Sequence, residues 1–148
     1  RKIYLDVCCL SRAFDDQKQD RIRLETEALD VIMQHMEAGR LIGVGGDVIH
    51  IELSQIADAE LRQRVINVST IVAKYVTLTE AERARAWELH RLGFGPMDAL
   101  HLASAETARV DVFLSTDDHL VKTGIKLKID LKVEVANPLT WLREEVGL

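Results

Sequence analysis

The sequence has few aromatic residues, few prolines and few cysteines. Among its 148 residues are two Trp, two Tyr, three Phe, two Pro and two Cys. So few aromatic side chains argue against a surface that binds single-stranded nucleic acid by stacking on its bases. The two cysteines, Cys8 and Cys9, are adjacent. This placement argues against a disulfide framework and predicts a protein of the reducing cytoplasm.

Long apolar runs and a strong positive charge are also absent. No run approaches the roughly 18 apolar residues that a membrane-spanning helix needs, so we expect a protein that does not cross a membrane. The formal net charge is −5, whereas domains that hold nucleic acid through bulk charge are usually strongly basic. An acidic site that recruits divalent cations would concentrate negative charge locally, so a nucleic acid substrate is still compatible with this balance.

Short apolar segments alternate with segments of helical periodicity along the whole chain. No repeat or linker divides it, and its 47% apolar and 29% charged residues are typical of a globular domain. Five strands are expected: Ile3–Val7, Leu41–Val44, Tyr75–Leu78, Val112–Leu114 and Lys132–Ala136. Strands separated by helices indicate a mostly parallel sheet covered on both faces. We predict a single domain over residues 1–148, an α/β fold in the form of a three-layer α/β/α sandwich.

Local signals mark several helix ends. Thr79 and Glu82 have the spacing of a capping box, and Pro96 is expected at a first helical position, where its missing N–H costs nothing. Asp47 is expected to cap the helix that follows the second strand. Two tryptophans with apolar neighbours at helical spacing are expected in the core: Trp87 and Trp141.

Four acidic residues are expected where open parallel sheets bind ligands, beyond the carboxyl ends of the strands. Asp6 ends the first strand, and Asp117 follows the fourth. Asp98 lies in the first turn of the helix that Pro96 opens, and Glu52 lies in the helix after the second strand. If the four converge, they form a pocket of hard oxygen ligands that suits Mg²⁺ or Mn²⁺ rather than zinc.

Each acid also has a purely structural interpretation. Asp98 suits the positive end of a helix dipole, Asp117 can cap the next helix, and Glu52 can be a solvated surface residue. Asp6 is the hardest to explain in this way. A carboxylate at the tip of a buried strand costs too much free energy unless something pairs it, and a cation is the obvious partner.

These segments together resemble the PIN-domain nucleases over nearly the whole chain. Tyr4-Leu5-Asp6 is similar to the opening strand with the first acid, and Val48–Leu53 to the segment with the second. The most specific match is Met97–Ala103, which carries the third acid. Phe113–Asp117 is similar to a Thr/Ser-x-Asp element with the fourth, and Val135–Pro138 resembles the closing strand and turn.

The resemblance implies a hydrolase, a Mg²⁺- or Mn²⁺-dependent endoribonuclease that cleaves RNA phosphodiester bonds. Asp6 and Asp98 would be the principal metal ligands, and Asp117 and Glu52 would complete the shell directly or through water. Such cations lower the pKa of bound water and neutralise charge on the scissile phosphate. Further residues are expected to contact substrate or to orient a carboxylate or water: Arg12, Ser115, Thr116 and His101. A histidine simply packed in the core is an equally good interpretation of His101.

The sequence departs from the family pattern at a few positions. Gly46 stands where the family often has Ser or Thr, which leaves two substitutes for Glu52: Asp47 and Glu60. Asp118 is a second candidate for the fourth acid, although the spacing to Ser115 favours Asp117. Many small members of the family are toxins of toxin–antitoxin pairs and are often dimeric. The resemblance therefore implies an antitoxin protein as partner and a homodimer, for which we expect apolar residues between positions 47 and 73 to form the contact.

Three other classes of protein fit less well. A phosphatase of the haloacid dehalogenase type needs a second Asp two residues after the first, and that position is Cys8. A receiver domain needs an acceptor Asp at the end of its third strand, where Tyr75–Leu78 offers none. A degenerate fold that only binds RNA or a protein partner would not need all four acids.

Overall fold

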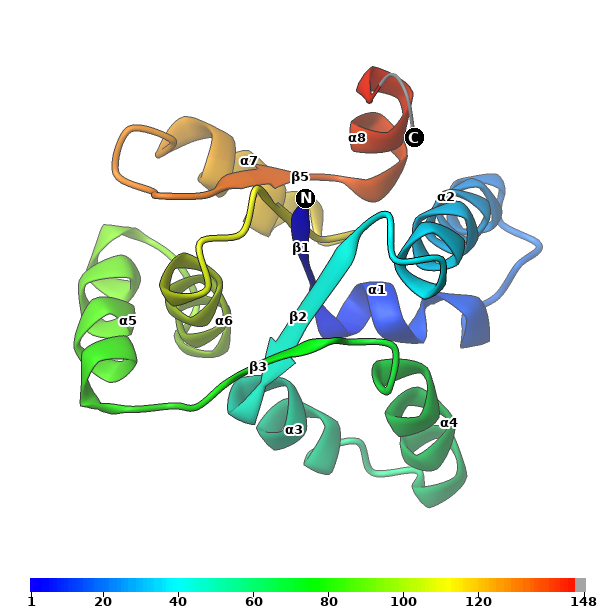
Figure 1. Ribbon diagram of the computed structural model, residues 1–148, viewed down its shortest axis with the longest axis horizontal. Coiled ribbons are helices and arrows are strands. Elements are labelled where there is room, and N and C mark those ends of the chain that lie inside the picture. The colour runs from blue at the N-terminus through cyan, green and yellow to red at the C-terminus, as the bar shows by residue number, and fades with distance from the viewer. Residues whose placement is uncertain (146–148) are drawn as a thin grey trace.

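The structure is a computed structural model that describes residues 1–145, and at its centre is a parallel β-sheet (Figure 1). The sheet has five strands in the order β3-β2-β1-β4-β5. In chain order they are β1 (Lys2–Leu5), β2 (Ile42–Gly46), β3 (Lys74–Val76), β4 (Val112–Leu114) and β5 (Glu134–Ala136). All four neighbouring pairs are parallel. Along the chain, β2 and β3 are therefore added on one side of β1, and β4 and β5 are then added on its other side.

Helices cover both faces of the sheet, which confirms the predicted three-layer α/β/α architecture. Helices α5 and α6 pack together on one side of it, and α2 and α8 on the other (Figure 1). The helices are α1 (Val7–Ser11), α2 (Asp20–Glu37), α3 (Asp47–Ser54), α4 (Ala59–Ser69), α5 (Glu80–Leu92), α6 (Pro96–Thr107), α7 (Asp118–Lys126) and α8 (Pro138–Glu144). A short 3₁₀ helix, η1 (Arg12–Phe14), follows α1.

Apart from Lys2 at the start of β1, the central strands are apolar because both of their faces are covered. Every residue of β4 is fully buried, and Tyr4 of β1 stacks on Phe113 of β4 with ring centroids 5.1 Å apart. The predicted bounds of β4 are confirmed. So are the helix starts at Thr79, where the capping box with Glu82 is present, and at Pro96.

Some local predictions are wrong, for physical reasons. The first strand ends at Leu5 rather than Val7, because Asp6 accepts the Val7 N–H and starts α1. Asp47 does not cap α3: its carboxylate accepts hydrogen bonds from the Leu78 N–H and the Tyr75 hydroxyl instead. Trp141 is buried as predicted, but the Trp87 side chain is 63% exposed.

Gly46 sets the position of α3 relative to the sheet. Its φ of 154° lies in the region that favours glycine, and a Cβ there would lie 2.1 Å from the Val76 carbonyl oxygen. Strand β2 passes too close to β3 at this point for any side chain. This close approach explains why a glycine occupies position 46.

Candidate metal-binding active site

The candidate site lies beyond the carboxyl ends of β1 and β4, where the direction of sheet building reverses. Ligands of open parallel sheets bind at this kind of position. The Asp6 N–H donates to the Leu114 carbonyl at 3.0 Å, so the first acid and the end of β4 are directly linked. Residues that are far apart in the sequence therefore meet here.

Asp6 is the most firmly held of the four acids. Its side chain is almost fully buried; Oδ1 accepts the Val7 N–H at 2.8 Å and Oδ2 accepts the Ser115 hydroxyl at 2.9 Å. The Cys8 thiol lies 3.4 Å from the same Oδ2. Burial raises the pKa of Asp6 above its ordinary value, although the neighbouring His101 opposes this shift. The carboxylate is therefore oriented before any ligand arrives.

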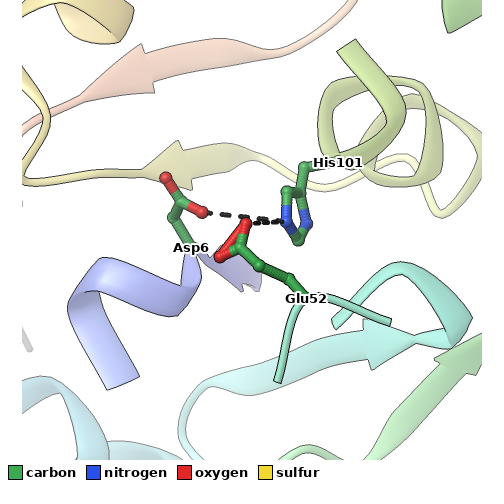
Figure 2. Close-up of side chains that lie close together, drawn as sticks. All are labelled: Asp6, Glu52 and His101. Carbon is green, nitrogen blue, oxygen red and sulfur yellow. Dashed lines mark hydrogen bonds and ion pairs between the residues drawn. The ribbon is translucent and has the colours of Figure 1, made fainter. Parts of the chain in front are cut away.

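Glu52 and His101 lie beside Asp6, as Figure 2 shows. The His101 Nε2 is 3.0 Å from Glu52 Oε1 and 4.0 Å from Asp6 Oδ1. One ligand atom from each of these residues lies within 4.8 Å of the other two, a spacing that could hold a metal ion. The imidazole is fully buried, and its Nδ1 lies 2.6 Å from the Tyr4 hydroxyl.

Asp98 interacts electrostatically with the other predicted acids. Its pKa is raised from 3.8 to about 6, first by burial and then by the negative charges of Asp6 and Asp117, with a further contribution from Glu52. The first turn of α6 places it there. The charges of the other three predicted acids therefore all raise the pKa of Asp98.

Asp117 is the better candidate for the fourth acid. It caps α7, with Oδ1 accepting the N–H groups of His119 and Leu120 at 2.9 and 3.2 Å. Its own N–H donates to the Ser115 hydroxyl oxygen at 3.1 Å, which ties it to the partner of Asp6. Asp118 instead forms two hydrogen bonds with Arg21, at 2.6 and 2.7 Å, and its side chain is 62% exposed.

The two substitutes for the second acid lie elsewhere. Asp47 is engaged by β3 and the residues that follow it, as described above. Glu60 is an exposed residue of α4 that pairs with Arg64 at 2.6 Å. Glu52 is therefore the acid of this segment that lies next to Asp6.

Arg12 and Thr116 are both engaged by other groups of the protein. The Arg12 guanidinium binds the buried Glu25 through two nitrogens, at 3.0 and 2.7 Å, and the more exposed Asp15 at 3.0 Å. Thr116 is nearly buried; its N–H donates to the Cys8 sulfur at 3.3 Å, and its carbonyl accepts from Arg21 at 3.0 Å. Contacts of either residue with RNA stay predictions.

Two residues of the site were not predicted from the sequence. Tyr4 contacts His101, and Cys8 contacts both Asp6 and the Ser115 hydroxyl, at 3.4 Å each. The presence of Cys8 corrects the expectation of a pocket without soft ligand atoms. Its position two residues after Asp6, in the first turn of α1, was the available signal.

The charge of the site favours a divalent cation. Within residues 1–145, no Lys or Arg forms an ion pair with any of the four acids, and His101 is the nearest basic group. Partly buried carboxylates with raised pKa values are stabilised by a cation, and carboxylate oxygens suit hard ions such as Mg²⁺ and Mn²⁺. The donor set therefore fits a divalent metal, without selecting which one.

A separate cavity of about 610 Å³ lies between α7, β5 and α8. Its lining is mostly apolar, with Val121, Ile125 and Val135 among the residues, and none of the four acids contributes to it. It is not part of the candidate site. In the part of the chain that the structure describes, no helix is both long and apolar enough to span a membrane.

Comparisons with known proteins agree with this picture. The family model described as PIN domain matches residues 3–126, a range that includes all four acids. A similar fold is found in the crystal structure of VapBC2 from Rickettsia felis bound to a DNA fragment from their promoter. The TM-score is 0.58 and the sequence identity 13%, over 93% of this chain and 98% of that chain. At this identity the similarity concerns the fold alone. No curated protein matches the sequence.

Proposed function

Because the chain belongs to the PIN domain family, we propose that it is a metal-dependent endoribonuclease that hydrolyses RNA phosphodiester bonds. The observation that carries this proposal is the clustering of Asp6, Glu52 and His101, whose ligand atoms lie within 4.8 Å of one another at the end of the sheet. The pKa of Asp98, raised to about 6 by burial and by the charges of Asp6 and Asp117, supports it. Among the described residues, no Lys or Arg pairs with these carboxylates at the end of the sheet. Their unpaired charge costs stability, and a functional site is a common reason for such a cost.

Four side chains would hold Mg²⁺ or Mn²⁺: Asp6, Glu52, Asp98 and Asp117. When bound, such a cation lowers the pKa of a coordinated water and neutralises charge on the scissile phosphate. The other residues prepare this pocket. The Ser115 hydroxyl and the Val7 N–H fix both oxygens of Asp6, and the cap on α7 fixes Asp117.

Arg12 is the proposed phosphate contact. One edge of its guanidinium is held by the buried Glu25, while the other pairs with Asp15, whose side chain is 42% exposed. Such an exposed ion pair contributes little, so a phosphate can replace Asp15 at small cost. Thr116 is proposed to orient a nearby water or carboxylate.

The proposed biological role is that of the toxin of a toxin–antitoxin pair, a cytoplasmic protein with an antitoxin as partner. This proposal rests on the resemblance of the sequence to small PIN-domain toxins and is supported by the fold similarity to VapBC2. A homodimer is proposed through the surface of α3 and α4, where Ile51 is an exposed apolar residue at 38%. Sedimentation at tens of micromolar tests this: Ile51→Asp should yield a monomer, and a wild-type protein that is already monomeric would contradict it.

The activity is tested by incubating a panel of labelled RNAs with the protein in Mg²⁺, in Mn²⁺ or in EDTA. We expect slow cleavage with either metal and none in EDTA. Glu52→Gln should abolish cleavage, whereas the matched control Glu60→Gln, at the exposed substitute position, should cleave as the wild type does. RNA binding without cleavage in any metal would contradict the proposal and would favour a module that only binds RNA or a partner.

A further inference from the structure

Three side chains from three different elements form one buried hydrogen-bonded chain that ends at Glu52. Tyr4 comes from β1, His101 from α6 and Glu52 from α3. The Tyr4 hydroxyl lies 2.6 Å from His101 Nδ1, and His101 Nε2 lies 3.0 Å from Glu52 Oε1. Tyr4 and His101 are both fully buried. This series of hydrogen bonds therefore reaches from the middle of the core to the acidic pocket.

The direction of these hydrogen bonds follows from the burial of Tyr4. A buried hydroxyl must donate its proton to an acceptor, and within residues 1–145 the partner of this hydroxyl is His101 Nδ1. Nδ1 is therefore the acceptor and carries no proton. A neutral imidazole then has its proton on Nε2, which faces the Glu52 carboxylate and donates to it.

We propose that Tyr4 and His101 are positioning residues that hold Glu52 beside Asp6 and that His101 does not ligate the metal. The proposal rests on the proposed metal-dependent function. A histidine ligand would need the lone pair of Nε2, so its proton would have to lie on Nδ1. That proton would point at the Tyr4 oxygen, and the fully buried hydroxyl proton of Tyr4 would have no acceptor among the described residues.

The arrangement explains how each of the two neighbouring acids is oriented. Asp6 has two donors of its own, the Val7 N–H and the Ser115 hydroxyl. Glu52 lies on α3, a helix of eight residues, and its side chain is 26% exposed. A glutamate side chain that becomes ordered loses rotamer freedom, which costs free energy. The His101 N–H restricts Glu52 before metal binds. Hydrogen-bond partners of this kind are typically worth 10–100-fold in metal affinity.

The first test is Mn²⁺ affinity, measured from the electron paramagnetic resonance signal of free Mn²⁺. We expect His101→Leu to weaken binding about tenfold or more. His101→Gln should recover most of that loss, since its amide can place an N–H near the position of Nε2–H. Tyr4→Phe keeps the ring stacked on Phe113 and should bind with intermediate affinity. The matched control is Tyr75→Phe, which removes a hydroxyl bound to Asp47 and should leave the affinity unchanged.

The second test is the tautomer of His101, read from its ring ¹⁵N shifts without metal and with diamagnetic Mg²⁺. We expect a protonated Nε2 and an unprotonated Nδ1 in both states, and a loss of this preference in Tyr4→Phe. A proton on Nδ1, or wild-type Mn²⁺ affinity in His101→Leu, would overturn the proposal. A wild type that binds no divalent metal would instead overturn the proposed function, and the tautomer would then still decide whether Tyr4 directs the imidazole toward Glu52.

Discussion

The Ser115 hydroxyl donates to the Asp6 carboxylate at 2.9 Å and so joins the ends of β1 and β4. The same hydroxyl oxygen accepts the Asp117 N–H at 3.1 Å. One small side chain thus links the carboxylate of Asp6 to the backbone of Asp117, another proposed metal ligand. The strand residues next to this link, Leu5 and Leu114, are buried.

Ser115→Ala should therefore lower activity without unfolding the protein. The loss of the hydrogen bond leaves Asp6 Oδ2 without its main donor, and we expect kcat/KM for RNA cleavage to fall about 10–100-fold. The measurement is single-turnover cleavage in saturating Mn²⁺. The control is Ser54→Ala, since within residues 1–145 the Ser54 hydroxyl bonds only to the Ile51 carbonyl of its own helix. Equal losses in both variants would contradict this role for Ser115.

Asp98→Asn should raise the melting temperature in EDTA, because it removes one of the repelling charges. We expect a gain of roughly 1–2 kcal/mol at neutral pH, since part of the repulsion is screened by solvent. That corresponds to roughly 3–6 °C for a domain of this size. Added Mg²⁺ should then stabilise the wild type by about 2.7 kcal/mol at a hundredfold excess over Kd, and the variant much less. Identical melting and identical metal shifts would show that the acids do not form one site.

The pH dependence of stability in EDTA should carry the signature of Asp98. Its pKa in the folded protein, about 6, is above the ordinary value of 3.8, so its ionisation opposes folding. The unfolding free energy should therefore be greatest below about pH 4 for this group and should fall as the pH rises through about 6. The difference between wild type and Asp98→Asn isolates this effect from other groups. A difference that is constant from pH 4 to pH 7 would contradict the raised pKa.

Gly46→Ala should destabilise the protein strongly. The added Cβ would lie 2.1 Å from the Val76 carbonyl oxygen, so β2 and β3 would have to separate. We expect a loss of about 3 kcal/mol in urea unfolding. Gly39 is the control: its φ of 77° is also positive, but a Cβ there meets nothing within 4 Å. Gly39→Ala should therefore lose only the backbone contribution, about 1–2 kcal/mol.

Much of the fold could be predicted because its central strands are short, mostly apolar segments. The bounds of β4 were predicted correctly since every residue of Val112–Leu114 is buried, and the alternation of strands and helices was sufficient for the parallel sheet. Predictions failed where a single side chain determines the end of a strand or where the exposure of one residue depends on packing. Asp6 ends β1 by capping α1, and periodicity alone did not show that Trp87 faces solvent.

The four acids could be selected from the sequence because they lie at or near strand and helix ends, and their role as metal ligands stays a prediction. Their supporting contacts could not be predicted. The hydrogen bond between Tyr4 and His101 joins residues 97 positions apart, and it depends on how α6 packs against β1. From the sequence, His101 was equally compatible with a packed core histidine. In the structure it is fully buried and also bonded to Glu52, so both descriptions apply.

The most direct test of the central claim compares RNA cleavage by Asp6→Asn and Asp118→Asn in Mn²⁺, under conditions where both variants are folded. The two substitutions remove the same charge, but Asp6 lies in the acidic pocket, whereas Asp118 pairs with Arg21 outside it. We predict that Asp6→Asn abolishes cleavage and that Asp118→Asn retains it. Undiminished cleavage by Asp6→Asn would contradict the account, because the metal-dependent site would then lie elsewhere.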